Sequence, residues 1–582
     1  MTETDIIELK MKIASLPSGG ISHKTINGKE YLYYQWTENG KQRGRRVKDN
    51  EVEQLTVAIA ERKRLQAMLK EAEKTKADKG TFSSDRTGEA LKRFIEPVKA
   101  FKKREIFPAL HDYVFGDVSD RVFVLYGLRR TGKTTMIRQV ISEMSEDMLE
   151  KTTFIQINAG NNLASINREL GELEAKGYRY IFLDEVTLME DFIEGAALFS
   201  DIYASSGMKI VLSGTDSLGF IFSEDEQLYD RCIMLHTTFI PYREFERVLG
   251  IHGIDEYIRY GGTMSMGGVK YNAEPTFATK AKTDEYVDSA IARNIQHSLK
   301  YYRYGGHFGS LAELYEKNEL TNAINRIIED INHRFTLDVL TRQFRSHDLR
   351  VSANNLRSTN DILDRIDTEA VTERLRELLE IRNREEQMVN ITDAHRAQIM
   401  EYLDLLDLTV DIDVVHLPDI GRPEKRMAIT QPGMRYSQAT ALIEQLMLDE
   451  VFSALSILER NEVAERILSE VKGRMLEDIV LLETAKAGKE RKVFKLQFAV
   501  GEYDMVVFDP RNVECEIFEV KHSDKTDMNQ YWHLVDAAKL KETEFHFGRI
   551  TRRTVLYRGE NKSIDGIEYL NVEEYLRNIV VE

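Results

Sequence analysis

One stretch of the sequence has the residue types and spacing of a phosphate-binding loop. Gly127 and Gly132 enclose four residues, and Lys133 and Thr134 follow directly, which satisfies the pattern G-x-x-x-x-G-K-[ST]. Glycines let backbone N–H groups approach phosphate oxygens, the lysine reaches the outer phosphates, and the threonine hydroxyl can ligate Mg²⁺. The predicted nucleotide-binding residues are Gly127, Leu128, Arg129, Arg130, Thr131, Gly132, Lys133, Thr134 and Thr135.

Two adjacent acids, Asp184 and Glu185, end the apolar run YIFLDE about fifty residues later. Asp184 is predicted to hold Mg²⁺ through water, and Glu185 to orient and deprotonate an attacking water. The alternative is that both acids only cap the next helix. A further run, KIVLSGT, brings either Ser213 or Thr215 to the terminal phosphate or to that water, and the sequence does not decide between them.

A second group of charged residues near the end of the chain could hydrolyse phosphodiesters. Glu477 falls in a helical pattern, Asp504 in the strand-like run EYDMVVFD, and Glu519 and Lys521 end the run CEIFEVK. The three carboxylates are predicted to bind a divalent metal ion, and the Lys521 ammonium to orient or activate water. The bare pattern is common by chance, so this prediction depends on the surrounding fold.

The third group is a basic, aromatic segment over residues 18–48. Its runs are separated by Asn27-Gly28 and Asn39-Gly40, the residue pairs of tight hairpin turns. The aromatic residues are Tyr31, Tyr33, Tyr34 and Trp36, and the basic residues are Lys24, Lys29, Lys41, Arg43, Arg45, Arg46 and Lys48, against the acids Glu30 and Glu38. The segment either contacts nucleic acid or packs its aromatic residues on the helical pattern at 50–77.

These residues require elements that hold them in place. Strand-like and helical runs alternate over residues 121–250, which predicts a parallel sheet with helices on both faces. The fold class is therefore α/β and multidomain. We predict a basic β-meander with a helix over 1–80, a P-loop domain over 90–275, a helical region over 276–450 with a small α/β insert or winged helix, and an α/β domain over 451–582.

Composition narrows the class of protein. The 582 residues carry a net charge of −17. This argues against a protein whose whole surface binds nucleic acid, but it allows one basic region that does. Cys232 and Cys515 fit neither a disulfide framework nor a metal site. The sequence shows no membrane-spanning run and no signal peptide, so we expect a cytoplasmic protein.

The motifs resemble those of a prokaryotic family of P-loop ATPases related to AAA+ proteins, an archaeal-type group that often carries a C-terminal DUF4143-like region. The likeness continues into DRCIMLHTTFIPYREF and YIRYGGTM. This chain has Asp230 where the family has Gly, and Met264 where it has Pro. The resemblance implies that Arg231 senses phosphate. It also implies that residues 451–582 form a PD-(D/E)xK nuclease-like fold, with Gln530 as a further polar site residue.

The leading hypothesis is an ATPase that uses ATP and Mg²⁺ and controls a metal-dependent nuclease domain acting on DNA or RNA, in a role such as defence. The rival is a non-cleaving, ATP-dependent switch or adaptor. A small-molecule kinase is disfavoured, because Glu185 beside Asp184 is typical of ATPases that hydrolyse. The expected partners are ATP, nucleic acid and further copies of the chain, with no membrane.

Overall fold

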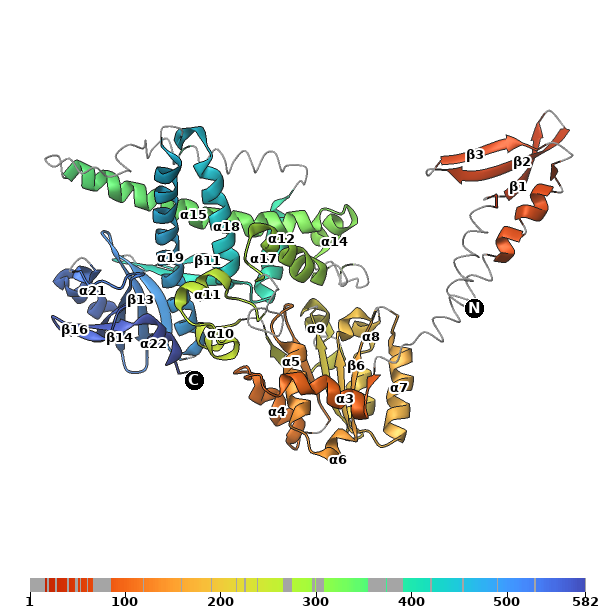
Figure 1. Ribbon diagram of the computed structural model, residues 1–582, viewed down its shortest axis with the longest axis horizontal. Coiled ribbons are helices and arrows are strands. Elements are labelled where there is room, and N and C mark those ends of the chain that lie inside the picture. The colour runs from red at the N-terminus through yellow and green to blue at the C-terminus, as the bar shows by residue number, and fades with distance from the viewer. Residues whose placement is uncertain are drawn as a thin grey trace. The chain divides into compact units, whose positions relative to one another are not determined.

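The fold is described from a computed structural model, shown as a ribbon in Figure 1. It describes residues 16–17, 20–26, 29–38, 41–47, 51–52, 54–59, 61–65, 85–118, 120–158, 160–189, 191–215, 217–223, 227–237, 239–264, 275–295, 299, 308–353, 373, 391–418, 421–452, 455–488, 490–527 and 530–580. The chain divides into two compact units, residues 1–85 and 86–582. None of the helices described is long and apolar enough to cross a membrane.

The N-terminal unit contains an antiparallel meander of β1 (Gly20–Ile26), β2 (Lys29–Glu38) and β3 (Lys41–Arg46). The predicted strands are therefore confirmed, while both Asn-Gly pairs lie outside the described residues. Tyr34 is buried with Val47 and Ile59. Tyr34 thus packs in a small core rather than on a ligand, as expected when alternate side chains of a strand point to one face. Of the helix predicted at 50–77, residues 66–77 lie outside the described residues.

The first sheet of the second unit has the order β4-β6-β7-β8-β5-β9. Its strands are β4 (Asp85–Arg86), β5 (Val122–Tyr126), β6 (Thr152–Gln156), β7 (Tyr180–Asp184), β8 (Lys209–Gly214) and β9 (Cys232–His236). The pairs β5–β8, β5–β9, β6–β7 and β7–β8 are all parallel. This confirms the predicted parallel sheet.

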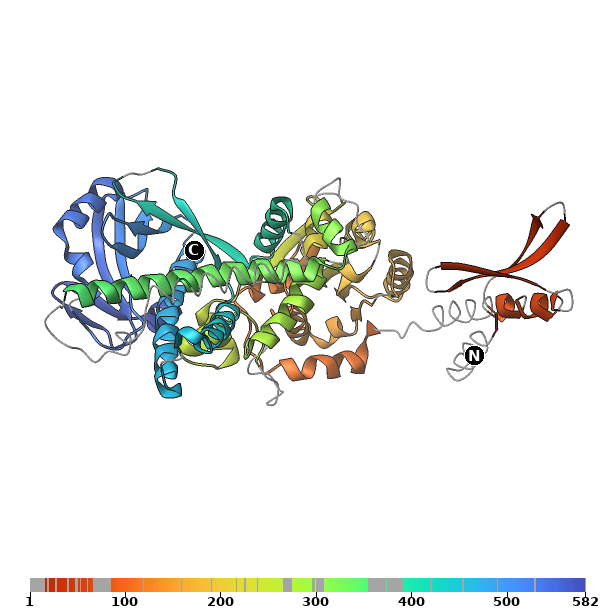
Figure 2. The same cartoon turned by 90° about the horizontal axis from the view of Figure 1, so that it is seen from above.

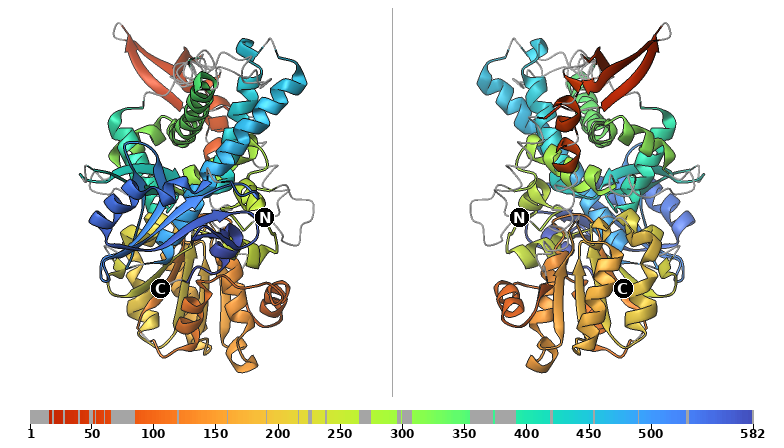
Figure 3. Two further views of the ribbon diagram at one scale, coloured as in Figure 1. Left: turned by 90° about the vertical axis from the view of Figure 1, so that its left-hand side faces the viewer. Right: turned by 90° about the vertical axis from the view of Figure 1, so that its right-hand side faces the viewer.

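Helices cover both faces of this sheet. Successive side chains of each strand point to opposite faces, so each strand contributes to two cores. Phe123 and Leu125 pack towards α3, α4 and α5, whereas Val122 and Val124 pack towards α7 and η3. Figures 1 and 3 show helices on either side of the strands. The helices are α3 (Gly88–Ile95), η1 (Glu96–Val98), α4 (Phe107–Phe115), α5 (Lys133–Ser142), α6 (Glu146–Leu149), α7 (Leu163–Ala175), η2 (Val186–Leu188), α8 (Phe192–Gly195), η3 (Phe199–Ala204), α9 (Ser217–Ser223), α10 (Tyr242–Leu249) and α11 (Ile254–Tyr260).

The second sheet is mixed and has the order β11-β10-β12-β13-β14-β15-β17-β16. Its strands are β10 (Thr409–His416), β11 (Glu424–Ile429), β12 (Lys492–Gln497), β13 (Glu502–Asp509), β14 (Glu514–Val520), β15 (Arg549–Tyr557), β16 (Lys562–Ile564) and β17 (Ile567–Asn571). β13 pairs with β14 in antiparallel register, and β14 with β15 in parallel register. The strand-like runs EYDMVVFD and CEIFEVK are confirmed as β13 and β14.

The remaining helices are α12 (Lys280–Tyr286), η5 (Val287–Ala292), α14 (Gly309–Glu316), α15 (Leu320–Ala353), α17 (Asp393–Leu405), α18 (Pro432–Met447), η7 (Glu450–Phe452), α19 (Ile457–Ala487), α20 (Trp532–Val535), α21 (Ala537–Phe547) and α22 (Val572–Arg577). The long helix α19 begins with a capping box. Ser456 accepts a hydrogen bond from the backbone N–H of Glu459, and the Glu459 carboxylate accepts one from the Ser456 backbone.

The prediction of a winged helix in residues 276–450 is wrong. The strands β10 and β11 are present, but Val414–His416 of β10 pair in parallel with Lys495–Gln497 of β12. The two strands therefore extend the sheet of the C-terminal region. Backbone groups on that edge of the hairpin are therefore satisfied by β12 rather than by a separate small domain.

The domain boundary predicted at residue 450 is also absent from the described residues. One hydrophobic core joins Ile240 and Tyr257, near the end of the first sheet region, with Leu442 of α18, Val471 of α19 and Phe518 of β14. The two sheets therefore belong to one compact unit, whose core is continuous across the predicted boundaries.

Candidate functional site

The loop between β5 and α5 has the backbone of a phosphate cradle. Three of its residues adopt positive φ angles: Gly127 (135°), Arg130 (64°) and Gly132 (93°). Glycine reaches such angles without steric cost. The Lys133 ammonium folds back over the loop and donates to the carbonyl oxygens of Gly127 and Leu128, at 2.9 and 2.8 Å. The loop thus curls around the Lys133 ammonium.

The two predicted Mg²⁺ contacts lie side by side. Thr134 Oγ1 donates to Asp184 Oδ2 at 2.7 Å, which joins the first turn of α5 to the end of β7. A hydroxyl and a carboxylate are the oxygen donors that Mg²⁺ prefers. These two residues therefore fit the ion, and their mutual hydrogen bond holds both oxygens at the mouth of the loop.

Glu185 has an unusual backbone and a defined partner. Its φ angle is 59°, in the left-handed region that residues other than glycine rarely adopt. Thr215 Oγ1 donates to Glu185 Oε2 at 3.1 Å. Burial, and then the neighbouring Asp184, raise the pKa of Glu185. A strained residue with a raised pKa beside a phosphate loop suits a catalytic base.

The structure distinguishes Ser213 from Thr215, between which the sequence did not decide. Ser213 lies inside β8, opposite Leu125, and its Oγ is buried without a hydrogen-bond partner among the described residues. Thr215, directly after the end of β8, contacts the predicted base. Thr215 is therefore the polar residue that the structure brings to the site.

Burial also shifts the titration of Lys133. Its side chain is almost fully buried, and this lowers the pKa of Lys133 to about 8, although Glu185 and Asp184 act in the opposite direction. Bound phosphate would favour the charged ammonium, so nucleotide binding and protonation of Lys133 are coupled.

A buried arginine that the sequence did not suggest holds the loop from behind. Arg104 donates to the carbonyl oxygens of Thr131 (2.8 Å) and Thr237 (2.9 Å), and its guanidinium pairs with Glu244. These bonds tie the phosphate loop to the segment after β9. Arg104 belongs to no motif, so only its contacts reveal it.

Arg231 does not lie at the phosphate site of its own chain, which corrects the expectation for this residue. It precedes β9, whose first residue Cys232 lies opposite Val122, the first residue of β5. The phosphate loop follows the C-terminal end of β5, whereas Arg231 lies at the N-terminal end of β9. Because the two strands are parallel, these ends lie a full strand length apart. The Arg231 side chain pairs with Asp201 instead, at 3.2 Å.

The phosphate loop is bonded to the helical region that follows. Tyr286 Oη of α12 donates to the Arg129 carbonyl at 3.3 Å and accepts a hydrogen bond from Gln431 Nε2 at 3.2 Å. The Met264 backbone N–H donates to the Arg130 carbonyl at 2.7 Å. Proline, which the related family carries at the position of Met264, has no N–H and cannot form that bond.

The four predicted residues of the C-terminal region converge on one cavity. Glu477 comes from α19, Asp504 from β13, and Glu519 and Lys521 from the end of β14. Lys521 Nζ lies 2.6 Å from Glu519 Oε2 and 3.1 Å from Asp504 Oδ2. The Val520 backbone N–H donates to Asp504 at 2.8 Å. Gln530 is not among the described residues that line this cavity; its side chain bonds to the backbone of Lys525 and Asp527.

Three further charged residues complete this acidic cluster. Glu502 lies two residues before Asp504 on the same face of β13, a signal that the sequence offered and that was missed. Lys495 Nζ lies 3.1 Å from Glu477, 3.0 Å from Glu502 and 3.7 Å from Asp504, while Arg474 pairs with Glu477 and Glu502. The charge of the carboxylates is thus largely neutralised by the buried Lys495 and the partly buried Arg474.

The titration of the cluster is uneven. Burial and then Asp504 raise the pKa of Glu477, and the same two causes hold the pKa of Glu519 well above its ordinary value. Burial alone would raise the pKa of Asp504, but Lys521 and Lys495 hold it well below its usual range. One ionised carboxylate therefore lies between groups that ionise with difficulty, an arrangement typical of sites that bind a cation.

The donor set fits a divalent ion. Oxygen atoms of Glu477, Glu502 and Asp504 lie within 4.8 Å of one another. Glu519 Oε1 is buried and has no hydrogen-bond partner among the described residues. A buried carboxylate oxygen without a partner is costly, and a metal ion would satisfy it.

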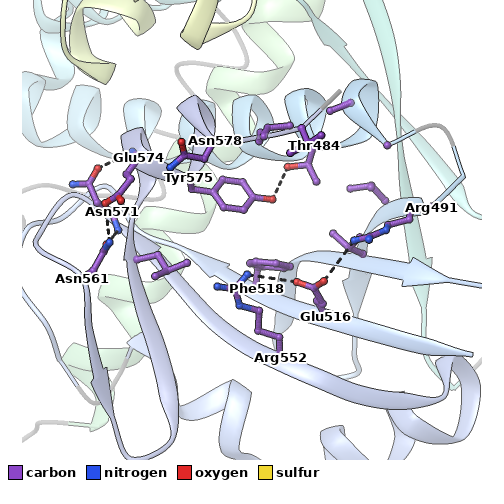
Figure 4. Close-up of a pocket in the computed structure, with 17 residues that line it drawn as sticks. Thr484, Arg491, Glu516, Phe518, Arg552, Asn561, Asn571, Glu574, Tyr575 and Asn578 are labelled. Carbon is purple, nitrogen blue, oxygen red and sulfur yellow. Dashed lines mark hydrogen bonds and ion pairs between the residues drawn. The ribbon is translucent and has the colours of Figure 1, made fainter. Parts of the chain in front are cut away.

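A separate cavity of about 480 Å³ lies between α19, α22 and the sheet (Figure 4). Its polar groups bond to one another: Tyr575 with Thr484 at 3.0 Å, and Arg491 with Glu516 at 3.6 Å. Glu516 and Phe518 point into it from β14, on the face opposite to that of Glu519. This cavity is therefore distinct from the acidic cluster.

Comparisons with known proteins support the first site. Residues 119–246 match a family described as "AAA domain", and residues 2–57 match a "Domain of unknown function (DUF6788)". No curated protein matches the chain.

Solved structures resemble the chain only weakly. They include the Aeropyrum pernix ORC1 protein in complex with DNA (13% identity, TM-score 0.20, 63% of this chain and 93% of that chain), C. elegans PCH-2 (16%, 0.19, 38% and 64%) and Hsp104 with ATPγS and FITC casein (15%, 0.16, 41% and 35%). These scores are too low to carry an argument. The parallel sheet, the phosphate loop and the matched family together show that the chain contains a P-loop domain of the AAA type.

Proposed function

We propose that the chain binds and hydrolyses ATP at the loop between β5 and α5. The contact of Thr134 with Asp184, next to Glu185, is the observation that carries this proposal. Thr134 and Asp184 would hold Mg²⁺, which neutralises charge on the phosphates when bound. Glu185, oriented by Thr215, accepts a proton from the attacking water, and Lys133 holds the phosphate that is released.

Mg²⁺-dependent ATP hydrolysis by the full chain tests this proposal. Glu185→Gln removes the base and keeps the shape, so turnover should fall by about 10²- to 10⁴-fold while ATP still binds. Glu172→Gln, at an exposed glutamate of α7, serves as the matched control. Wild-type protein that binds ATP without hydrolysing it would contradict the assignment of Glu185.

The acidic cluster supports a second activity, metal-dependent cleavage of nucleic acid. The buried, unbonded Oε1 of Glu519, in a cavity with Asp504, Glu477 and Lys521, favours this reading over a purely structural charge network. A divalent ion held there would stabilise charge that develops on a phosphodiester. Lys521, fixed by two carboxylates, orients the water or the phosphate oxygen.

Contacts within the second unit support control of this cluster by the nucleotide site. Tyr286 links Arg129 of the loop to Gln431, at the start of α18. Arg435 of α18 pairs with Asp478 of α19 at 2.8 Å, directly after Glu477. A change in the loop thus has a continuous bonded route to the acidic cluster.

Cleavage assays decide between this proposal and a non-cleaving switch. DNA and RNA are incubated with Mg²⁺ or Mn²⁺ and with ATP, ADP or no nucleotide. Glu519→Ala and Asp504→Asn should abolish cleavage, whereas Glu514→Gln, on the same strand, should not. If the wild type cleaves none of these substrates under any nucleotide condition, the adaptor reading replaces the nuclease.

The N-terminal meander supports nucleic-acid contact through its exposed basic residues. Arg45 and Arg46 are exposed, and Arg45 pairs with Glu51 at 2.8 Å. Tyr34 is not available, since it lies in the core of the unit. Loss of affinity for a labelled oligonucleotide in Arg45→Gln/Arg46→Gln would support this role, and unchanged affinity would contradict it.

A further inference from the structure

A basic cavity adjoins the acidic cluster. It has a volume of about 550 Å³ and shares Gln497 and Glu502 with the cavity of the cluster. Arg474 and Lys495 also line it and pair with the carboxylates on the other side. These four side chains therefore lie at the border between the two cavities.

Elements from outside the β12–β14 region form the other walls. They are α15, α17 and the β10–β11 hairpin, and Figure 2 shows α15 running alongside this part of the unit. The six basic residues that line the cavity are Arg334, Arg396, Lys425, Arg426, Arg474 and Lys495, against three acids, Asp338, Glu424 and Glu502. The cavity is thus basic within a chain of net charge −17.

The outer basic side chains can reach a ligand. The exposed fractions of their side chains are 68% for Arg334, 64% for Lys425 and 41% for Arg396. Their carboxylate partners, Asp330 and Asp411, are not among the described residues that line the cavity. The Lys425–Asp411 pair is exposed on both sides, so it contributes little to stability and a phosphate group can replace the carboxylate readily. The Asp330 side chain is only 16% exposed, so phosphate groups would bind the exposed faces of Arg334 and Arg396 without displacing it.

We propose that this basic cavity binds the phosphodiester backbone of a nucleic-acid strand and presents it to the acidic cluster. The proposal rests on the nuclease activity proposed above and assigns its substrate-binding surface. Phosphates contact Arg334, Arg396 and Lys425, and the apolar side chains of Phe335 and Met400, which also line the cavity, pack against sugars or bases. The strand then continues past Lys495 towards Asp504.

Binding of fluorescent 20-nucleotide DNA and RNA strands by the full-length protein tests the proposal. EDTA is present, so that binding is measured without cleavage. Arg334→Gln/Lys425→Gln should raise Kd at least tenfold and reduce the slope of log Kd against log salt by about 1.5, as expected when two phosphate contacts are lost. The control Lys317→Gln/Arg511→Gln removes two exposed, paired cations elsewhere and should change Kd less than twofold.

A second readout separates this cavity from the N-terminal meander. Bound oligonucleotide should protect Lys425 from acylation, measured by mass spectrometry, and leave Lys317 reactive. Unchanged Kd and unprotected Lys425 would overturn the proposal, as would tight binding of a polyglutamate peptide with no binding of DNA or RNA.

The outcomes also separate this inference from the nuclease itself. If the cavity variant loses binding but the wild type never cleaves, the cavity stands as a nucleic-acid site and the nuclease fails. If the wild type cleaves and the cavity variant binds and cleaves equally well, the cavity assignment is wrong and the nuclease stands.

Discussion

Thr134 Oγ1 and Asp184 Oδ2 lie 2.7 Å apart, although fifty positions separate the two residues in the sequence. The contact joins the first turn of α5 to the end of β7, and it brings both oxygens to the place where a Mg²⁺–nucleotide complex is expected.

Asp184→Asn should weaken the response to Mg²⁺. The amide keeps the shape but loses the charge that attracts the ion, so the Mg²⁺ concentration for half-maximal ATP hydrolysis should rise about 10- to 100-fold. A Mg²⁺ titration of ATPase activity measures this, with Asp147→Asn, at an exposed aspartate of α6, as the control. An unchanged titration would place the ion elsewhere.

Thr215→Val and Ser213→Ala should behave differently. Thr215 orients Glu185, so its loss should lower kcat about tenfold, with little change in the Kd for ATP. Ser213 Oγ has no partner among the described residues, so its removal should leave kcat within about twofold. Steady-state kinetics of both variants check the assignment, and a larger loss in Ser213→Ala would reverse it.

ATP affinity should fall as the pH rises through about 8. Burial lowers the pKa of Lys133 to about 8, and the charged form binds phosphate, so the Kd should be constant below pH 7 and rise roughly tenfold by pH 9. Titrations with a fluorescent ATP analogue measure the profile. Lys133→Arg stays charged and should give a flat profile, whatever its absolute affinity; the same rise in that variant would exclude Lys133 as the cause.

Arg104→Ala should destabilise the P-loop domain. It leaves Glu244 buried without its charge partner, a loss of about 3–5 kcal/mol when a buried pair is broken from one side. The double variant Arg104→Ala/Glu244→Gln removes that charge and should recover part of the lost melting temperature. If the double variant melts lower than the single one, the ion pair is not the cause.

Glu483 should make the fold less stable at alkaline pH. Burial raises the pKa of Glu483 from 4.5 to about 8, while its carboxylate accepts a hydrogen bond from the Tyr242 backbone at 2.6 Å. The folded chain therefore binds more protons than the unfolded chain between these values. The stabilisation is complete below pH 4.5 and is lost as the pH rises through 8.

Glu483→Gln keeps the acceptor for Tyr242 and cannot ionise. Its melting temperature should consequently fall less than that of the wild type between pH 5 and pH 8.5, whereas Glu514→Gln should follow the wild type. Parallel curves for Glu483→Gln and the wild type would assign the pH dependence to other groups.

The sequence by itself determined the parallel sheet and the position of the phosphate loop. Apolar runs of strand length that alternate with helical runs have one stable arrangement, and the glycines of the loop are needed locally for its positive φ angles. The same local logic located Asp184 and Glu185 at the end of β7, and Asp504 and Glu519 on neighbouring strands.

Only the tertiary structure decided the contacts between distant segments. It showed that Thr215, and not Ser213, contacts Glu185, and that Arg231 lies at the opposite ends of the strands from the phosphate loop. It also revealed that Arg104 bonds to the backbone of the loop. It also joined β10 to β12 in place of a winged helix and brought Lys495 into the acidic cluster. Such contacts depend on which strands pair and which faces pack, and these choices are set by the burial of the whole core rather than by any local pattern.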